Sequence, residues 1–399
     1  MSRPLRVAFI HPDLGIGGAE RLVVDAALGL QNLGHTVDLY TSYHDPNHCF
    51  EETRDGTLNV HHIRPPFPRS LHGKLHILFA HLRQLHLTFH LLSHTSPDYD
   101  VYFVDQLSTC VPFLRTLGHT RVVFYCHFPD KLLANGAFVE GSGSMMRRGG
   151  LLKKLYRLPM DWLEEVTTRQ ADVILANSGF TARVFRAYFP SITQMPRVVY
   201  PGINISAYEA PIDYSDSHIV EITSERPTLL SLNRFEGKKN AKLALEAFGL
   251  LKKRRPDLRD LRLVLADVLF LLNFTTAQRT ALLRNPRSLA LLYTPANEHF
   301  GIVPVEAMAC GIPVLACDSG GPTESVWARA LEEIVNLPEE ERKAMGERAK
   351  RRAREMFGME AMSRGWRGFG GLSGWGTLLI MFFGFLVAYL VGPFVLPAS

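Results

Sequence analysis

The order of predicted elements repeats along the chain. A strand is predicted at residues 5–10, a glycine-containing loop follows, a helix begins near Ala19 and ends at Gly34, and a second strand covers residues 35–41. Strands joined by a helix in this way lie parallel in one sheet and are buried on both faces. The same order recurs at residues 227–266. The repeat predicts an α/β protein with two doubly wound, Rossmann-like halves.

The length of 399 residues suits two such domains with an additional segment. We expect a first domain at residues 1–207 and a second at residues 227–365, because each range contains its own series of strands and helices. Residues 208–226 are polar and carry no strong period, so we expect a linker there. The net charge of only +5 does not indicate a nucleic-acid partner, and the five cysteines show no metal-binding spacing.

The C-terminal segment, residues 366–399, has a different composition. Residues 378–396 form an uncharged apolar run, and a helix needs about 20 such residues to span a bilayer. Tryptophans precede the run as interface anchors would, and the basic residues at 348–357 would keep the main body on the cytosolic side. We expect a transmembrane anchor; a buried core helix is the alternative.

The segment 71–94 is predicted to form an amphipathic helix. Helical spacing places Arg83 and most of the histidines opposite a broad apolar stripe. The stripe contains Leu75, Leu78, Phe79, Leu82, Leu85, Phe89 and Leu92. A helix facing the core and a helix at a membrane surface both suit this pattern. The spacing of His86, His90 and His94 would also suit a metal, but no carboxylate or cysteine joins them.

The loop at residues 11–20 is the first candidate binding element. Gly17 and Gly18 lie where the chain passes from strand to helix. Glycines allow backbone N–H groups to approach a phosphate, and the helix N-terminus adds partial positive charge. The spacing differs from the G-x-G-x-x-G pattern, which argues against a dehydrogenase. Ordinary turn formation is the alternative.

A basic loop at residues 233–240 is the second candidate. Arg234 ends a predicted strand, and Lys239 lies before the next predicted helix. Ligands of open parallel sheets bind at the carboxyl ends of the strands, where two cations would neutralise a diphosphate. A solvated basic loop is the alternative.

Two glutamates form the third candidate. Glu298 follows a predicted strand, Glu306 lies on the next predicted helix, and Phe300, Gly301 and Ile302 form the turn between them. The N–H groups of the turn would face an anion, Glu306 would accept hydrogen bonds from a ribose diol, and Glu298 would face a sugar. A helix-capping acid and a structural ion pair are the alternative.

Together these motifs resemble a known enzyme family. The glycine loop, the sequence NRFEGKKN at 233–240 and the E-x7-E spacing occur in the order typical of retaining nucleotide-sugar glycosyltransferases with the GT-B fold. The stretches YCHFPD at 125–130 and YTPANEHFG at 293–301 are similar to mannosyltransferases that use GDP-mannose to add an α-1,3 and then an α-1,6 mannose to dolichol-linked oligosaccharides. The resemblance covers most of residues 5–325. It implies an N-terminal acceptor-side domain and a C-terminal nucleotide-sugar-binding domain facing a cleft.

The resemblance also implies roles for residues of both domains. Gly17 and Gly18 would line the nucleotide diphosphate and the acceptor side. His127 would contact the donor sugar from the N-terminal domain. Arg234 and Lys239 would hold the diphosphate.

In the C-terminal domain, the resemblance implies that Glu298 orients the mannose or stabilises charge at its anomeric carbon, and that Glu306 binds the ribose. Phe300, Gly301 and Ile302 would face the phosphates. Such enzymes substitute on one face of the sugar, and the leaving phosphate takes the acceptor proton. Charge that builds on the diphosphate is then stabilised by preorganised cations and amides, so neither a metal nor another cofactor is required. Glu298 and His127 are the expected catalytic residues.

The resemblance implies an enzyme of N-glycan precursor synthesis, held at the endoplasmic reticulum membrane with its catalytic body on the cytosolic face. Its substrates would be GDP-mannose and a dolichol-diphosphate-linked oligosaccharide. Other mannosyltransferases of the same pathway are candidate partners, and no nucleic acid is expected.

The second domain is shorter than the resemblance implies. A glycine turn and a helix are missing after Asp267, and further blocks are missing near residues 320–334 and 362–371. Loss of a helix and a strand would expose apolar sheet surface, at about 25 cal/mol for each Å². Two alternatives therefore stay open: a catalytically impaired membrane scaffold, and a lipid-linked glycosyltransferase that uses another sugar nucleotide.

Overall fold

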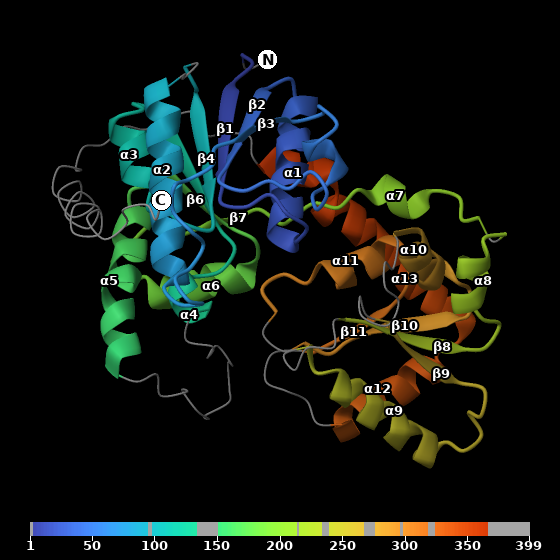
Figure 1. Cartoon of the computed structure of the whole chain (residues 1–399). Helices are drawn as coiled ribbons and strands as arrows, with labels where there is room; N and C mark the ends of the chain where they lie inside the picture. The colour runs from blue at the N-terminus through green and yellow to red at the C-terminus, as the bar shows by residue number, and fades with distance from the viewer. Residues whose placement is uncertain are drawn as a thin grey trace. The chain divides into compact units, whose positions relative to one another are not determined.

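The structure, a computed structural model, describes residues 3–94, 98–133, 151–213, 215–233, 239–266, 276–295, 298–317 and 324–365. They form two compact units, each with its own sheet (Figure 1). Those up to Tyr200, with residues 362–365, belong to the first unit, and Pro201–Ala361 belong to the second. No helix among these residues is both long and apolar enough to cross a bilayer. The span expected at 378–396 lies outside them.

The sheet of the first unit confirms the expected parallel α/β order. Its seven strands follow the spatial order β3-β2-β1-β4-β5-β6-β7, and each neighbouring pair is parallel. The strands are β1 (Arg6–His11), β2 (Thr36–Thr41), β3 (Asn59–His62), β4 (Val101–Asp105), β5 (Arg121–Cys126), β6 (Val173–Ala176) and β7 (Arg197–Val198). The chain order reverses between β1 and β4, and ligands of such sheets bind outside the carboxyl ends of the strands at this point. His11 and Asp105 end these two strands.

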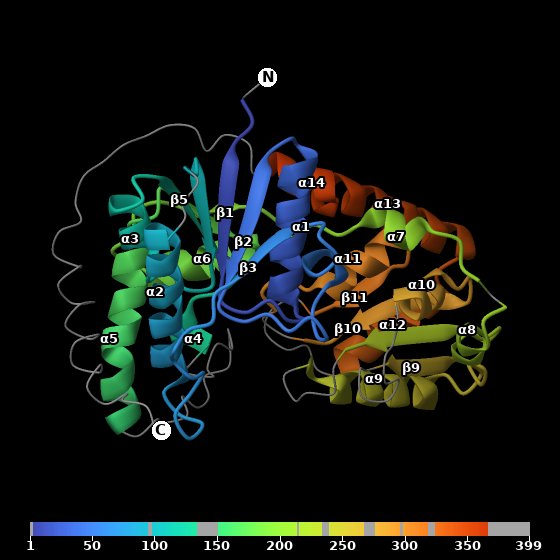
Figure 2. The same cartoon turned by 45° about the horizontal axis from the view of Figure 1, so that its top comes forward.

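Helices cover both faces of this sheet (Figures 1 and 2). One face carries α1, and the other carries α2, α3, α5 and α6. The bounds are α1 (Gly18–Asn32), α2 (His76–His94), α3 (Val111–Thr116), α4 (Asp130–Leu133), α5 (Leu151–Thr168) and α6 (Gly179–Tyr188), with a 3-10 turn η1 (Glu51–Thr53). A buried cluster joins Leu87 of α2, Leu114 of α3 and Phe185 of α6 to Ile10 and Phe124 of the sheet. This core fixes the strand ends that carry the polar residues of the pocket described below.

The helix expected at 71–94 is α2, but its buried face differs from the apolar stripe read in the sequence. Phe79 and Leu82 of the stripe are buried, but so are Leu87 and Leu91 outside it, whereas Phe89 and Leu75, just before the helix, are 40% and 36% exposed. Helical spacing predicts the buried face of a helix from its apolar residues alone. The prediction fails where polar residues are also buried because they form hydrogen bonds with neighbouring segments.

Polar residues of α2 are buried because they find such partners in neighbouring segments. Arg83 donates to the carbonyl oxygen of Ser42 at 3.2 Å, and Gln84 donates to that of Leu107 at 2.6 Å. Burial lowers the pKa of His81 to about 4, so this histidine is neutral at pH 7. The prediction that Arg83 faces membrane headgroups is therefore wrong. The prediction that this helix packs against the core is confirmed.

The second unit has a smaller parallel sheet. The order of the four strands is β11-β10-β8-β9 among the residues that the structure describes. The strands are β8 (Thr228–Leu232), β9 (Arg262–Ala266), β10 (Ser288–Tyr293) and β11 (Val314–Ala316). The strands expected from the apolar runs of this half are therefore confirmed, and so is their parallel arrangement.

Helices also lie on both faces of the second sheet. Leu251 of α9 and Trp327 of α12 pack in one cluster, and Leu282 of α10 and Ala307 of α11 pack in the other. The bounds are α7 (Ile205–Glu209), α8 (Ser217–Ile222), α9 (Ala241–Arg254), α10 (Thr276–Arg284), α11 (Ile302–Ala309), α12 (Glu324–Asn336), α13 (Glu339–Phe357) and α14 (Met359–Gly365). The range 208–226, where a linker was expected, contains α8 and the end of α7, and its described residues fall in the second unit. The domain boundaries read from the sequence stay predictions.

Gly346 provides a test of the packing of α11 against α13. A Cβ at Gly346 would overlap the carbonyl oxygen of Gly311, which ends the turn after α11. Gly346→Ala is therefore expected to lower the free energy of unfolding of the second unit by about 2 kcal/mol or more. Urea denaturation would measure the change. Gly249→Ala is the matched control, because nothing lies within 4 Å of its Cβ position on α9, and it should stabilise the unit by about 0.5–1 kcal/mol. Equal effects of the two substitutions would contradict the close approach.

Candidate functional site

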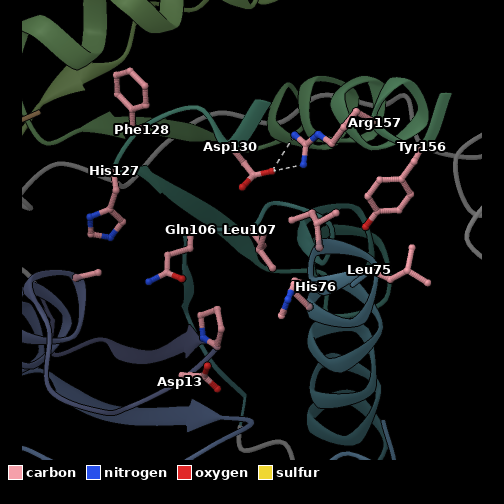
Figure 3. A pocket seen from close by; sticks show the side chains of 14 residues that line it. Asp13, Leu75, His76, Gln106, Leu107, His127, Phe128, Asp130, Tyr156 and Arg157 are labelled. Carbon is pink, nitrogen blue, oxygen red and sulfur yellow. Dashed lines mark hydrogen bonds and ion pairs between the residues drawn. The ribbon is translucent and has the colours of Figure 1, made fainter. Parts of the chain in front are cut away.

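The first unit contains a pocket of about 740 Å³ (Figure 3). It lies beside the ends of strands, α2 and α5, and mixes apolar walls with polar side chains. Its lining is formed by Pro12, Asp13, Ala19, Leu75, His76, Ile77, Ala80, Gln106, Leu107, His127, Phe128, Asp130, Tyr156 and Arg157. His127 and Phe128 lie on one side, and Leu75 and Tyr156 lie on the other. Planar polar groups beside aromatic rings suit a sugar better than a purely apolar ligand, because a sugar has hydroxyl groups as well as apolar faces.

One sequence-predicted residue, His127, reaches this pocket through a buried network. His127 Nε2 lies 3.0 Å from Asp105 Oδ2, and His11 Nδ1 lies 2.7 Å from Asp105 Oδ1. Asp105 and His11 are almost fully buried. Burial alone would lower the pKa of His11, but the Asp105 carboxylate outweighs it and raises the pKa to about 10. His11 is therefore a cation at pH 7, and Asp105 is its counter-ion.

The glycine loop brings a second acid to this network. Gly17 is the extended N-cap of α1 and Gly18 is its first residue. A Cβ at Gly17 would collide with the carboxylate of Glu20, which lies 3.9 Å from His11 Nε2. Burial opposes ionisation of Glu20, but its interaction with His11 lowers its pKa overall. A phosphate at this helix N-terminus would meet a like charge, so the expected diphosphate role of Gly17 and Gly18 stays a prediction.

A second charged group lines the pocket at the start of α4. Both terminal nitrogens of Arg157 lie 3.0 Å from Asp130 Oδ2, and Arg157 Nη2 lies 2.5 Å from Asp161. The Asp130–Arg157 pair is drawn in Figure 3. Glu164 accepts the backbone N–H groups of Asp130 and Lys131 at 2.6 and 3.0 Å. This carboxylate therefore holds the segment that carries His127 and Asp130 in place.

Glu164 makes the stability of the first unit depend on pH. Burial, aided by the charge of Asp130, raises the pKa of Glu164 from 4.5 to about 7. A folded-state pKa above the unfolded-state value means that the folded unit binds the proton more tightly, so the stabilisation is present below pH 4.5 and is lost as the pH rises through about 7. We expect the free energy of unfolding of the wild-type chain to contain a contribution of about 2–3 kcal/mol from Glu164 that is present at pH 5 and absent at pH 8. Urea denaturation at the two pH values should show that this contribution is missing in Glu164→Gln. The same pH dependence in both proteins would contradict the assignment.

The second unit brings together two of its predicted residues. Lys239 Nζ lies 2.5 Å from Glu298 Oε2, and both side chains remain partly exposed. Thr294 donates to the carbonyl oxygen of Lys239 at 2.8 Å, which ties this loop to the end of β10. An ion pair was the alternative reading of the acidic residue, and Glu298 does form one. Arg234, the other expected cation, lies outside the described residues.

The turn between the two glutamates begins a helix. Gly301 has φ 77° and is the N-cap of α11. A left-handed conformation of this kind favours glycine, because other residues place Cβ too close to the backbone. Phe300 packs against Phe357 with ring centroids 5.7 Å apart, so its side chain stabilises the second unit. Ile302 is the first residue of α11, and no side chain of the described residues caps this N-terminus. The expected anion-binding role of Phe300, Gly301 and Ile302 stays a prediction.

Glu306 is held by donors of its own unit. Tyr208 Oη lies 2.7 Å from Glu306 Oε1, and Arg279 Nη1 lies 2.7 and 2.9 Å from its two oxygens. Glu306 is 4% exposed. A carboxylate accepts about four hydrogen bonds, so a ribose diol would have to displace or share the Arg279 guanidinium. The expected contact with ribose stays a prediction.

The sequence analysis did not predict several residues of these networks, among them His11, Asp105, Arg157, Tyr208 and Arg279. His11 and Asp105 had a signal, because each polar residue ends an apolar strand on one side of the point where the strand order reverses. The contact of Arg157 with Asp130 and those of Tyr208 and Arg279 with Glu306 had none, because each joins segments that are distant in the sequence. Among the residues that the structure describes, no group of three or more His, Cys, Asp or Glu side chains is arranged to hold a metal ion.

Two family models match the two halves of the chain. Residues 16–207 match the model described as Glycosyltransferase Family 4, and residues 215–328 match the model described as Glycosyl transferases group 1. Together with the two parallel α/β units, these matches define the class of the protein as a glycosyltransferase.

Curated relatives narrow this class. The chain is 42% identical to the alpha-1,3/1,6-mannosyltransferase ALG2 of Rhizomucor pusillus, with 91% of this chain and 90% of the relative covered. It is 40% identical to that of Kluyveromyces lactis (90% and 83% covered) and 36% identical to that of Candida albicans (90% and 97% covered). The chain belongs to the alpha-1,3/1,6-mannosyltransferase family. The Rhizomucor alignment extends over 426 positions, more than the 399 residues of this chain, so this chain lacks segments that the relative has.

Solved structures show the same fold. Sucrose-phosphate synthase from Thermosynechococcus elongatus has a TM-score of 0.62 at 15% identity, with 98% of this chain and 100% of that chain covered. Anabaena HepE in complex with UDP and glucose has a TM-score of 0.56 at 15% identity, with 90% and 97% covered. The chain therefore has the GT-B fold, which confirms the expectation from the sequence.

Proposed function

We propose that the chain transfers mannose from GDP-mannose to a dolichol-diphosphate-linked oligosaccharide, first in an α-1,3 and then in an α-1,6 linkage. The observation that carries the proposal is identity of 36–42% over about nine-tenths of the chain to relatives named alpha-1,3/1,6-mannosyltransferases. The reaction would take place at the cytosolic face of the endoplasmic reticulum membrane. The predicted span at 378–396 and a lipid-linked acceptor support a membrane location.

Within this proposal the second unit binds the donor. Lys239 would leave Glu298 in part and neutralise the diphosphate, while Glu298 would face the mannose. The N-terminus of α11 (Ile302–Ala309) would add partial positive charge at the phosphates. Charge that builds on the leaving diphosphate is the main electrostatic cost of the reaction, and these groups would stabilise it without a metal ion.

The first unit would bind the acceptor beside His127. The pocket of about 740 Å³ has the mixed polar and aromatic lining that suits a sugar. His127 would contact the transferred sugar from this side. The leaving phosphate would take the proton of the acceptor hydroxyl, so no protein base is assigned to that step.

Donor competition tests the proposal. The full chain in detergent should bind GDP-mannose by calorimetry, unlabelled GDP should displace it, and UDP-glucose should compete at least about 100-fold less well, which corresponds to about 2.7 kcal/mol. Preferential binding of UDP-glucose would instead favour a lipid-linked glycosyltransferase with another donor. Absence of GDP-mannose binding by the folded chain would overturn the proposal.

A further inference from the structure

Asp105 joins a buried histidine to a histidine of the pocket. Its two oxygens lie 2.7 and 2.9 Å from His11 Nδ1, and Oδ2 lies 3.0 Å from His127 Nε2. The Asp105 and His11 side chains are each 1% exposed, whereas that of His127 is 20% exposed. Asp105 therefore cannot reach a ligand itself, but it contacts a residue that can.

The hydrogen bonds fix where the protons lie. An ionised carboxylate only accepts hydrogen bonds, so both histidines must donate to Asp105. His11 donates through Nδ1–H, and His127 donates through Nε2–H. A singly protonated imidazole whose proton lies on Nε2 keeps the lone pair of Nδ1 free to accept a hydrogen bond.

The rest of His127 is also held in place. Asn177 donates to the carbonyl oxygen of His127 at 2.9 Å. The ring meets Tyr125 edge-on, with centroids 5.1 Å apart. No hydrogen bond of Nδ1 to a described residue competes for it, and the ring lines the pocket (Figure 3).

We propose that Asp105 is a positioning residue that fixes His127 as the Nε2–H tautomer and presents Nδ1 to the pocket as a hydrogen-bond acceptor. Nδ1 then recognises a group that donates a hydrogen bond, and phosphate oxygens of a nucleoside diphosphate do not donate. The donating groups of the proposed substrates are guanine N–H groups and sugar hydroxyls, and a sugar hydroxyl is the one that suits the mixed polar and aromatic lining of this pocket. This identification of the ligand rests on the proposed function, whereas the tautomer does not.

A tautomer measurement tests the first half of the proposal without any donor. The full chain labelled with ¹⁵N-histidine should show a pyrrole-type Nε2 and a pyridine-type Nδ1 for His127, assigned by loss of the signals in His127→Ala. Asp105→Asn should shift His127 toward a mixture of tautomers. A proton on Nδ1 in the wild-type chain overturns the proposal, even if the Asp105→Asn chain does not fold. An unchanged tautomer in folded Asp105→Asn also overturns it.

Transfer kinetics test whether Asp105 acts through His127. Asp105→Asn should lower kcat/KM for mannose transfer by about 10- to 100-fold, as loss of a supporting hydrogen-bond partner does at other sites. In the His127→Ala background, Asp105→Asn should cause no further loss of kcat/KM, because the two residues act as one unit. Independent, multiplying losses would overturn the positioning role.

Asp38→Asn is the matched control for loss of a buried carboxylate. Asp38 lies on β2 of the same sheet, is 7% exposed and accepts a hydrogen bond from Tyr99 at 2.9 Å, but it does not line the pocket. Asp38→Asn should leave the His127 tautomer unchanged. In the double variant with His127→Ala, the fold-losses in kcat/KM of the two single variants should multiply. If the wild-type chain gives no transfer from GDP-mannose, the proposed function fails while the tautomer measurement still decides the role of Asp105.

Discussion

Glu298→Ala is expected to lower the rate of mannose transfer to a lipid-linked acceptor in membranes by about 100-fold or more. The size follows from losses of this order when one preorganised group that stabilises developing charge is removed. Glu298 is partly exposed and lies 2.5 Å from Lys239, so it is placed to respond to a bound donor. The measurement is incorporation of labelled mannose by membranes that contain equal amounts of each chain.

The control for this substitution is another glutamate of the second unit. Glu246 forms an exposed ion pair with Lys242 on α9, at 3.3 Å. Such surface pairs contribute at most about 1 kcal/mol, so Glu246→Ala should leave transfer unchanged. Unchanged transfer by Glu298→Ala would show that the catalytic site has been assigned to the wrong residue.

Glu306→Ala is expected to have two separable effects. The substitution removes the partner of Arg279 and Tyr208, so the free energy of unfolding of the second unit should fall by about 2–4 kcal/mol. Larger losses are known for fully buried ion pairs, but Arg279 is partly exposed. If Glu306 binds the ribose, donor affinity should also fall by about 10- to 100-fold at a temperature where the unit is folded, as for loss of hydrogen bonds to a charged group.

Urea denaturation and calorimetry measure these effects independently. A double-mutant cycle with Arg279→Ala should give a coupling energy between the two residues, whereas Glu246→Ala combined with Arg279→Ala should give none. Unchanged stability would contradict the Arg279 contact. Unchanged donor affinity in the folded variant would show that the ribose is bound elsewhere.

The elements that could be predicted from the sequence are those set by local pattern. The apolar runs that became β1 and β10 are short, flanked by turns and buried on both faces, so their type and parallel arrangement follow from periodicity and order. The helix at 76–94 was also predicted, but only part of its buried face was. Arg83 and Gln84 are buried because carbonyl oxygens of other segments accept their hydrogen bonds, and helical spacing holds no information about those segments.

The same distinction applies to the candidate site. Lys239 and Glu298 could be found, because each follows a strand of the same parallel sheet and the strand ends of such a sheet meet at one edge. The partners of Glu306 could not be found, since Tyr208 and Arg279 reach it from separate helices. The segments that this chain lacks relative to the Rhizomucor protein were visible in the sequence as absent turns, but their effect on activity is a matter for experiment.

The most direct test of the central claim is mannose transfer by the full chain. Membranes that contain it, and that have no such activity of their own, would receive GDP-mannose and a dolichol-diphosphate-linked oligosaccharide. We expect two mannose residues to be added in succession, the first α-1,3-linked and the second α-1,6-linked, with retained configuration at the anomeric carbon. A folded chain that binds GDP-mannose but adds no mannose, and that gains transfer only when the missing segments are restored, would contradict the claim and identify an impaired member of the family.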